Sequence, residues 1–146
     1  MNKKIIVTNN PMLPEELKGY KIIFVNSLSD VYHKTRDLVH KNWKLVSHPL
    51  AGSVKPAQNP YRTVILIASG NLDFYSLDLI ESAIYKLKQF ERKQKDRTYS
   101  KRIKEDYQLI DLTFINSALK KHDLLRWFFG LKYLEVNIIK KGAIKC

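Results

Sequence analysis

The sequence predicts an α/β fold, a small three-layer domain in which helices flank a mostly parallel central sheet of about four strands. Short β-branched runs alternate along the chain with segments of helical period. The 146 residues are enough for one domain with a real core. The balance of 45% apolar and 27% charged residues is that of a globular protein.

Four short apolar runs predict the strands, over Lys4–Thr8, Lys21–Val25, Trp43–Val46 and Thr63–Ala68. The last run is almost continuously apolar, as expected of a central strand covered on both faces. Between the first two runs, Pro14 and two glutamates begin a short predicted helix that Gly19 ends, which indicates a βαβ unit. No crossover helix separates the third run from the fourth, so an antiparallel pair is left open there.

Three apolar stripes with helical spacing predict the longer helices. We expect the first helix to be capped by Ser29 and to end near His40. The stripes are Val31, Thr35, Leu38 and Val39; Leu77, Ile80, Ile84 and Leu87; and Ile103, Tyr107, Ile110, Phe114 and Ala118. We interpret residues 1–122 as a single α/β domain and residues 123–146 as an aromatic and basic tail, helical and then extended, packed on the domain or on a partner.

Charge and cysteine content limit the classes of function. The formal net charge is +12, from 26 Lys and Arg against 14 Asp and Glu. This balance fits nucleic acid, an anionic membrane surface or anionic metabolites as partners, and it fits equally a lysine-rich surface that favours solubility. The single cysteine, Cys146, forms no internal disulfide, and no Cys/His cluster has zinc spacing, so we expect no metal and no cofactor.

No targeting segment stands out in the sequence. The apolar run near the start, Ile5–Val7, is too short for a signal peptide. No stretch approaches the roughly 20 apolar residues of a membrane span. We therefore expect a cytoplasmic protein without a membrane span.

The segment Ser47–Tyr61 is the strongest candidate for a functional loop. It joins two predicted strands without helical period and contains three prolines and a glycine. Loops this long are uncommon in compact domains, and the ordered ones are usually functional. The prolines lower the entropy cost of holding one conformation. The simpler interpretation, a loop that only turns the chain, stays open.

The candidate ligand-binding residues are Asn9, Asn10, His48, Gly52, Ser53, Lys55 and Ser69. Gly52 allows close approach of the backbone to a ligand, while Ser53 and Lys55 add a hydroxyl and a charge suited to phosphate or carboxylate. His48 could bind a ligand, act as acid or base, or only cap a strand. The remaining three follow predicted strands, and parallel strands would bring them to one edge of the sheet with the loop.

The motif His48-Pro-Leu-Ala-Gly-Ser-Val-Lys-Pro56 resembles the GrdX-like proteins, together with Val7–Pro11, Leu72–Phe74 and Asp106–Leu112. The resemblance covers Lys4–Leu119. These small proteins are encoded beside the glycine, sarcosine and betaine reductase components of anaerobes that ferment amino acids. The resemblance implies an accessory role in that metabolism and supplies no catalytic residues. The tail after Leu119 departs from the family pattern.

Three functions follow from these observations. The leading hypothesis is a non-catalytic accessory protein that binds a small anionic ligand or a reductase component through Ser47–Tyr61. The second is a small enzyme acting on a phosphorylated or carboxylated metabolite, with His48 as acid or base. The third is a nucleic-acid-binding protein that uses the basic run Arg92–Arg102, although no known nucleic-acid-binding motif is present. The sequence leaves a homodimer open.

Overall fold

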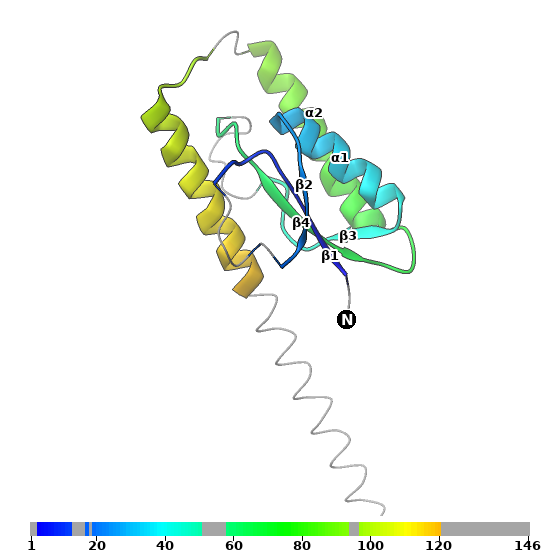
Figure 1. Ribbon diagram of the computed structural model, residues 1–146. Coiled ribbons are helices and arrows are strands. Elements are labelled where there is room, and N and C mark those ends of the chain that lie inside the picture. The colour runs from blue at the N-terminus through cyan, green and yellow to red at the C-terminus, as the bar shows by residue number, and fades with distance from the viewer. Residues whose placement is uncertain (1–2, 13–16, 18, 51–57, 94–96, 121–146) are drawn as a thin grey trace, which may run out of the picture. The chain divides into compact units, whose positions relative to one another are not determined.

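The computed structural model describes residues 3–12, 17, 19–50, 58–93 and 97–120 (Figure 1). It forms two compact units, Met1–Ile115 and Asn116–Cys146. The first unit contains, in order, β1 (Lys4–Thr8), β2 (Lys21–Phe24), α1 (Leu28–His40), β3 (Trp43–Leu45), β4 (Thr63–Ala68) and α2 (Phe74–Lys93). A third helix covers residues 101–120. The predicted elements are therefore confirmed within a residue or two wherever the described ranges reach them.

The sheet is mixed, so the prediction of a mostly parallel sheet is wrong. Its strand order is β2-β1-β4-β3. Only β1 and β2 are parallel, whereas β4 runs antiparallel to both β1 and β3. The sequence between β3 and β4 has no helical period for a crossover helix, so the chain returns in the opposite direction and the two strands pair antiparallel. The predicted three-layer arrangement stays a prediction.

Strand direction decides which strand ends meet. β1, β2 and β3 run in the same direction, and β4 runs in the opposite direction. The carboxyl ends of β1, β2 and β3 therefore lie at one edge of the sheet, which we call the carboxyl edge. Asn9, Asn10 and Ser47 follow strands at this edge. Ser69 follows β4 and lies at the opposite edge, where its N–H donates to the Asn42 carbonyl at 2.8 Å. The expected convergence of all three strand ends is therefore wrong for Ser69.

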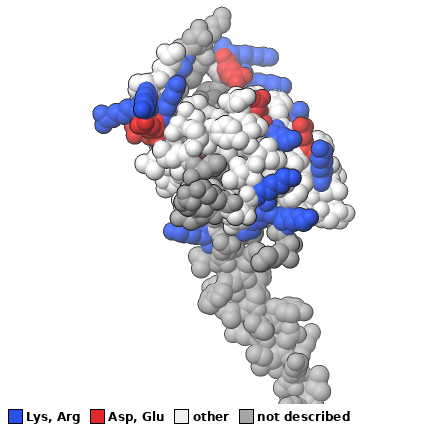
Figure 2. Space-filling view, viewed as in Figure 1, with Lys and Arg blue, Asp and Glu red and all other residues white. Residues whose placement is uncertain are grey.

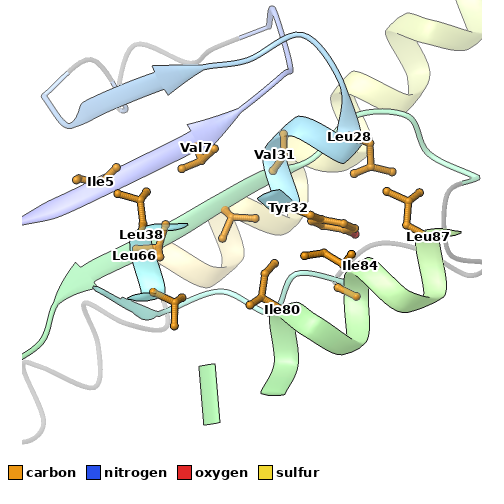
Figure 3. Close-up of a cluster of buried hydrophobic side chains, with 13 residues drawn as sticks. Ile5, Val7, Leu28, Val31, Tyr32, Leu38, Leu66, Ile80, Ile84 and Leu87 are labelled. Carbon is orange, nitrogen blue, oxygen red and sulfur yellow. The ribbon is translucent and has the colours of Figure 1, made fainter. Parts of the chain in front are cut away.

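The core lies between the sheet, α1 and α2, which pack side by side (Figure 1). Alternate residues of β1 and β4 point into it, because side chains along a strand alternate between the two faces. Figure 3 shows these side chains meeting the apolar stripes of the two helices around Tyr32. The central members are Ile5, Val7, Val31, Tyr32, Leu66, Ile80, Ile84 and Leu87.

The helix of residues 101–120 buries a different stripe from the predicted one. Ile103, Ile110 and Phe114 are 43%, 41% and 45% exposed. The buried residues of this helix in the first unit are Gln108, Asp111, Leu112 and Ile115. The apolar spacing misled the prediction because the buried face includes Asp111, whose carboxylate is hydrogen-bonded, and a hydrophobic pattern does not register such burial.

The ends of the helices are fixed by local hydrogen bonds. Ser27, and not the expected Ser29, caps α1: its Oγ accepts the N–H of Asp30 at 3.1 Å. After α1, Asn42 has φ 64°, the left-handed conformation that commonly ends a helix. At the start of α2, Asp73 accepts the N–H of Ser76 at 3.0 Å and also its hydroxyl.

Several predictions lie outside the described residues. They are the short helix begun by Pro14, the tail 123–146 and the loop residues Gly52, Ser53 and Lys55. In the described part, no helix is long and apolar enough to cross a membrane.

Candidate functional site

A network of buried polar side chains closes the carboxyl edge of the sheet. Its centre is Asp111, which is 4% exposed. Its Oδ1 accepts the backbone N–H of Thr63 at 3.0 Å, and its Oδ2 accepts the Thr63 hydroxyl at 2.7 Å and the Asn10 side-chain amide at 3.0 Å. Asp111 was not among the site residues predicted from the sequence.

The direction of the protons in this network follows from its geometry. The Thr63 hydroxyl donates its proton to Asp111. Because the Thr8 and Thr63 hydroxyl oxygens are 2.7 Å apart, Thr8 must be the donor in the hydrogen bond between them. Thr8 in turn accepts the backbone N–H of Asn10 at 3.0 Å. The bonds form a closed ring through Asn10, whose side-chain amide also donates to the Gln108 carbonyl at 2.9 Å. Asn10 is thus fully occupied by structural bonds.

Asn9 and Asn59 hold the end of the loop in place. The Asn9 side chain donates to the Pro60 carbonyl and accepts the Arg62 N–H, both at 2.8 Å. Asn59 accepts the Tyr61 N–H at 2.9 Å and donates to the Tyr107 carbonyl at 3.0 Å. These bonds fix residues 59–62 against both β1 and the third helix.

The beginning of the loop is anchored by Tyr32 and Ser47. The Tyr32 hydroxyl donates to the Pro49 carbonyl at 2.9 Å, and the Ser47 hydroxyl accepts the Ile65 N–H at 2.9 Å. Burial raises the pKa of Tyr32, and the Asp111 charge adds to this, while the charge and hydrogen bond of the Arg62 guanidinium oppose it. The hydroxyl therefore remains a proton donor at neutral pH.

A cavity of about 620 Å³ opens beside this network. Five described segments form it: the end of β1, the start of α1, the end of the loop, the end of α2, and residues 97–104. The lining residues are Asn9, Asn26, Ser27, Leu28, Ser29, Pro60, Tyr61, Leu87, Phe90, Glu91, Arg97, Thr98, Tyr99 and Lys104. It lies at the carboxyl edge of the parallel pair β1 and β2, the place where open α/β sheets commonly bind ligands.

The exposed rim of the cavity is mainly basic. Arg97 and Lys104 are exposed and form no ion pair with any residue that the structure describes. Among the described lining residues, Glu91 is the acidic one. Figure 2 shows Lys and Arg side chains, with a few acidic ones, gathered where α2 ends and the third helix begins. Such a rim attracts anions and repels cations.

Only some of the predicted site residues lie at or beside the cavity. Asn9 lines the cavity, and Asn10 lies buried beside it. His48 is exposed, and its Nδ1 accepts the Leu50 N–H at 3.1 Å, which leaves the proton of the neutral ring on Nε2. Ser69 lies at the other edge. Gly52, Ser53 and Lys55 lie outside the described ranges.

Sequence reasoning missed the residues that contribute most to the charge and shape of the cavity. Arg97 belongs to the basic run Arg92–Arg102, Lys104 lies just after it, and neither was among the predicted ligand-binding residues. Tyr99 carried no signal of its own. The excess of Lys and Arg over Asp and Glu in the basic run was a signal for anion binding. The position of Arg97 and Lys104 beside β1, however, depends on the tertiary fold.

Together, fold and cavity define a small mixed α/β protein with a ligand-sized cavity at the carboxyl edge of its sheet. The chain belongs to the GrdX-like family: the family model for GrdX-like proteins matches residues 5–120. The resemblance seen in the loop motif is thereby confirmed. Neither a curated protein nor a solved structure matches the chain.

Proposed function

We propose that the protein is a non-catalytic accessory protein of reductive, glycine reductase-type amino-acid fermentation in anaerobes, and that it acts in the cytoplasm by binding a small anionic ligand or a reductase component. Membership of the GrdX-like family supports the association with this metabolism. The cavity supports the binding role, because it joins unpaired cations to a volume typical of ligand sites.

The observation that carries this proposal is the position of Arg97 and Lys104 on the rim of the cavity. The end of the loop Ser47–Tyr61 contributes Pro60 and Tyr61 to the same wall. This position supports a binding role for the end of the loop, and His48, Gly52, Ser53 and Lys55 remain proposed ligand contacts in the rest of it.

A thermal-shift screen at moderate salt tests the binding role. The panel contains phosphate, pyrophosphate, acetyl phosphate, glycine and betaine. A ligand at 100 times its Kd adds about 2.7 kcal/mol to stability, which raises the Tm of a chain of this size by several degrees. We expect such a shift for at least one anion.

Three variants assign the shift to a site. Arg97→Gln with Lys104→Gln removes the rim cations, and His48→Ala with Lys55→Ala removes the proposed loop contacts. Lys86→Gln with Lys88→Gln removes the same charge from exposed positions of α2 that do not line the cavity. A shift lost in the first variant but kept in the last supports the cavity. A shift lost equally in the first and last variants contradicts it.

The reductase component is tested separately by co-purification with the purified reductase subunits. Retention of one subunit by the parent protein, and its loss in the Arg97/Lys104 variant, supports a protein partner at this site. Absence of both a thermal shift and a retained subunit contradicts the proposed function.

A further inference from the structure

The buried and the exposed parts of the cavity wall differ in polarity. Its buried part is mainly apolar: Leu28 and Leu87 are 8% and 4% exposed, and the side chain of the third buried residue, Asn9, is hydrogen-bonded to the backbone of Pro60 and Arg62. Above them, half-buried Phe90, Tyr61 and Tyr99 add aromatic surface. The charged side chains of the lining are all exposed and belong to the rim.

The aromatic wall is held in place before any ligand binds. The Tyr99 ring packs edge-on against Tyr107, with ring centres 5.3 Å apart and planes at 75°. Its hydroxyl donates to the Gln58 carbonyl at 3.0 Å. The backbone of Tyr61 is fixed as well, because its N–H donates to Asn59 Oδ1. A ligand that contacts Tyr99 therefore meets a ring that loses little freedom on binding.

A small inorganic anion uses only part of this site. It would meet the basic rim and leave the apolar wall against water, although burying that wall is favourable. A ligand whose anionic group lies at the rim and whose apolar body lies on the wall matches both parts. Glu91 on the same rim disfavours a second negative charge at its end of the cavity.

We infer that the cavity selects an anion with an apolar body, an aryl or alkyl phosphate or carboxylate, over bare phosphate or acetate. This inference rests on the proposed function, because it names the ligand class of the same cavity. Arg97 and Lys104 bind the anionic group, and Leu87, Phe90 and Tyr99 contact the body.

Calorimetric titration of matched probes tests this selectivity. The pairs are inorganic phosphate with phenyl phosphate and acetate with phenylacetate, and benzyl alcohol serves as the neutral body. Burying roughly 60 Å² of apolar surface corresponds to about a tenfold lower Kd. We therefore expect at least one aryl anion to bind about tenfold more tightly than its bare partner, and the pair that shows this identifies the anionic group.

Variants separate the two parts of the site. Arg97→Gln with Lys104→Gln should weaken the aryl anion about tenfold, while Lys86→Gln with Lys88→Gln should leave its Kd within about twofold. Phe90→Ala, at a half-buried position, should reduce the advantage of the aryl anion and leave the bare anion unchanged. Circular dichroism confirms that each variant is folded.

The outcomes distinguish this inference from the function on which it rests. Equal binding of bare and aryl anions overturns the inference and leaves an anion-binding accessory protein. Binding of benzyl alcohol as tight as that of the aryl anions overturns the role of the rim. Absence of binding by every probe overturns the inference, and the subunit co-purification then decides the proposed function alone.

Discussion

Asp111 is the residue on which the carboxyl edge depends most. Three donors from β1 and β4 converge on its carboxylate. A buried donor left without an acceptor costs about 1–3 kcal/mol. The network therefore ties the third helix to the sheet more specifically than apolar contact alone could.

We expect Asp111→Ala to lower the free energy of unfolding by about 3 kcal/mol or more, because it leaves buried donors on Thr63 and Asn10 unpaired. Asp111→Asn should cost less, about 1–3 kcal/mol, since one carbonyl oxygen remains to accept. Urea denaturation measures both. Asp106→Asn, at an exposed position of the same helix, is the control. Equal stability of Asp106→Asn and Asp111→Ala would contradict the role of the network.

The cap of α2 gives a prediction in acid. The hydrogen bond from the Ser76 hydroxyl lowers the pKa of Asp73 below its usual 3.8. A lowered folded pKa means that the contribution is complete above pH 3.8 and is lost as the pH falls through the folded value. Asp73→Ala should cost about 1 kcal/mol at neutral pH, the usual value of an N-cap. The difference from the parent protein should shrink below pH 3.8, as followed by thermal unfolding across pH.

The third helix shows at the scale of elements how a buried face is chosen. Leu112 is 7% exposed, whereas Phe114 is 45% exposed. Leu112→Ala should cost about 2–4 kcal/mol by leaving a cavity, and Phe114→Ala should cost less than about 1 kcal/mol. Denaturant titration of the two variants compares them. A larger loss for Phe114→Ala would restore the face that apolar spacing alone predicts.

The extents of the elements were predictable because period and breakers are local signals. β1 and β4 were predicted with their observed bounds, and the predicted cap of α1 lay two residues after the observed one. Strand direction and the buried face of the third helix were not predictable in this way. Both depend on contacts between residues far apart in the sequence, such as Asn10 with Asp111.

The candidate site was predictable only in part, for the same reason. The polar residues after β1 were located by their position after a strand, and the loop Ser47–Tyr61 by its prolines and its lack of helical period. The cavity itself joins five segments, and two of them, the end of α2 and residues 97–104, carry no motif. Their meeting is a property of the tertiary fold.

For the whole molecule, the net charge of +12 determines behaviour toward nucleic acids. We expect weak, sequence-independent binding to DNA at about 50 mM salt, which falls by orders of magnitude at about 200 mM as counterions are no longer released favourably. Fluorescence anisotropy at the two salt concentrations, with two unrelated duplexes, measures this. Binding that persists at the higher salt and prefers one duplex would favour the nucleic-acid hypothesis.

The pairing of the two central strands, β1 and β4, also determines how late in synthesis the sheet can form. Thr8 leaves the ribosome 55 residues before its partner Thr63, a delay of about 3–11 s at bacterial and eukaryotic rates of synthesis. Until then one edge of β1 has no native partner and can pair wrongly. Asp111 follows another 48 residues later, so the carboxyl edge closes only when most of the chain has been made.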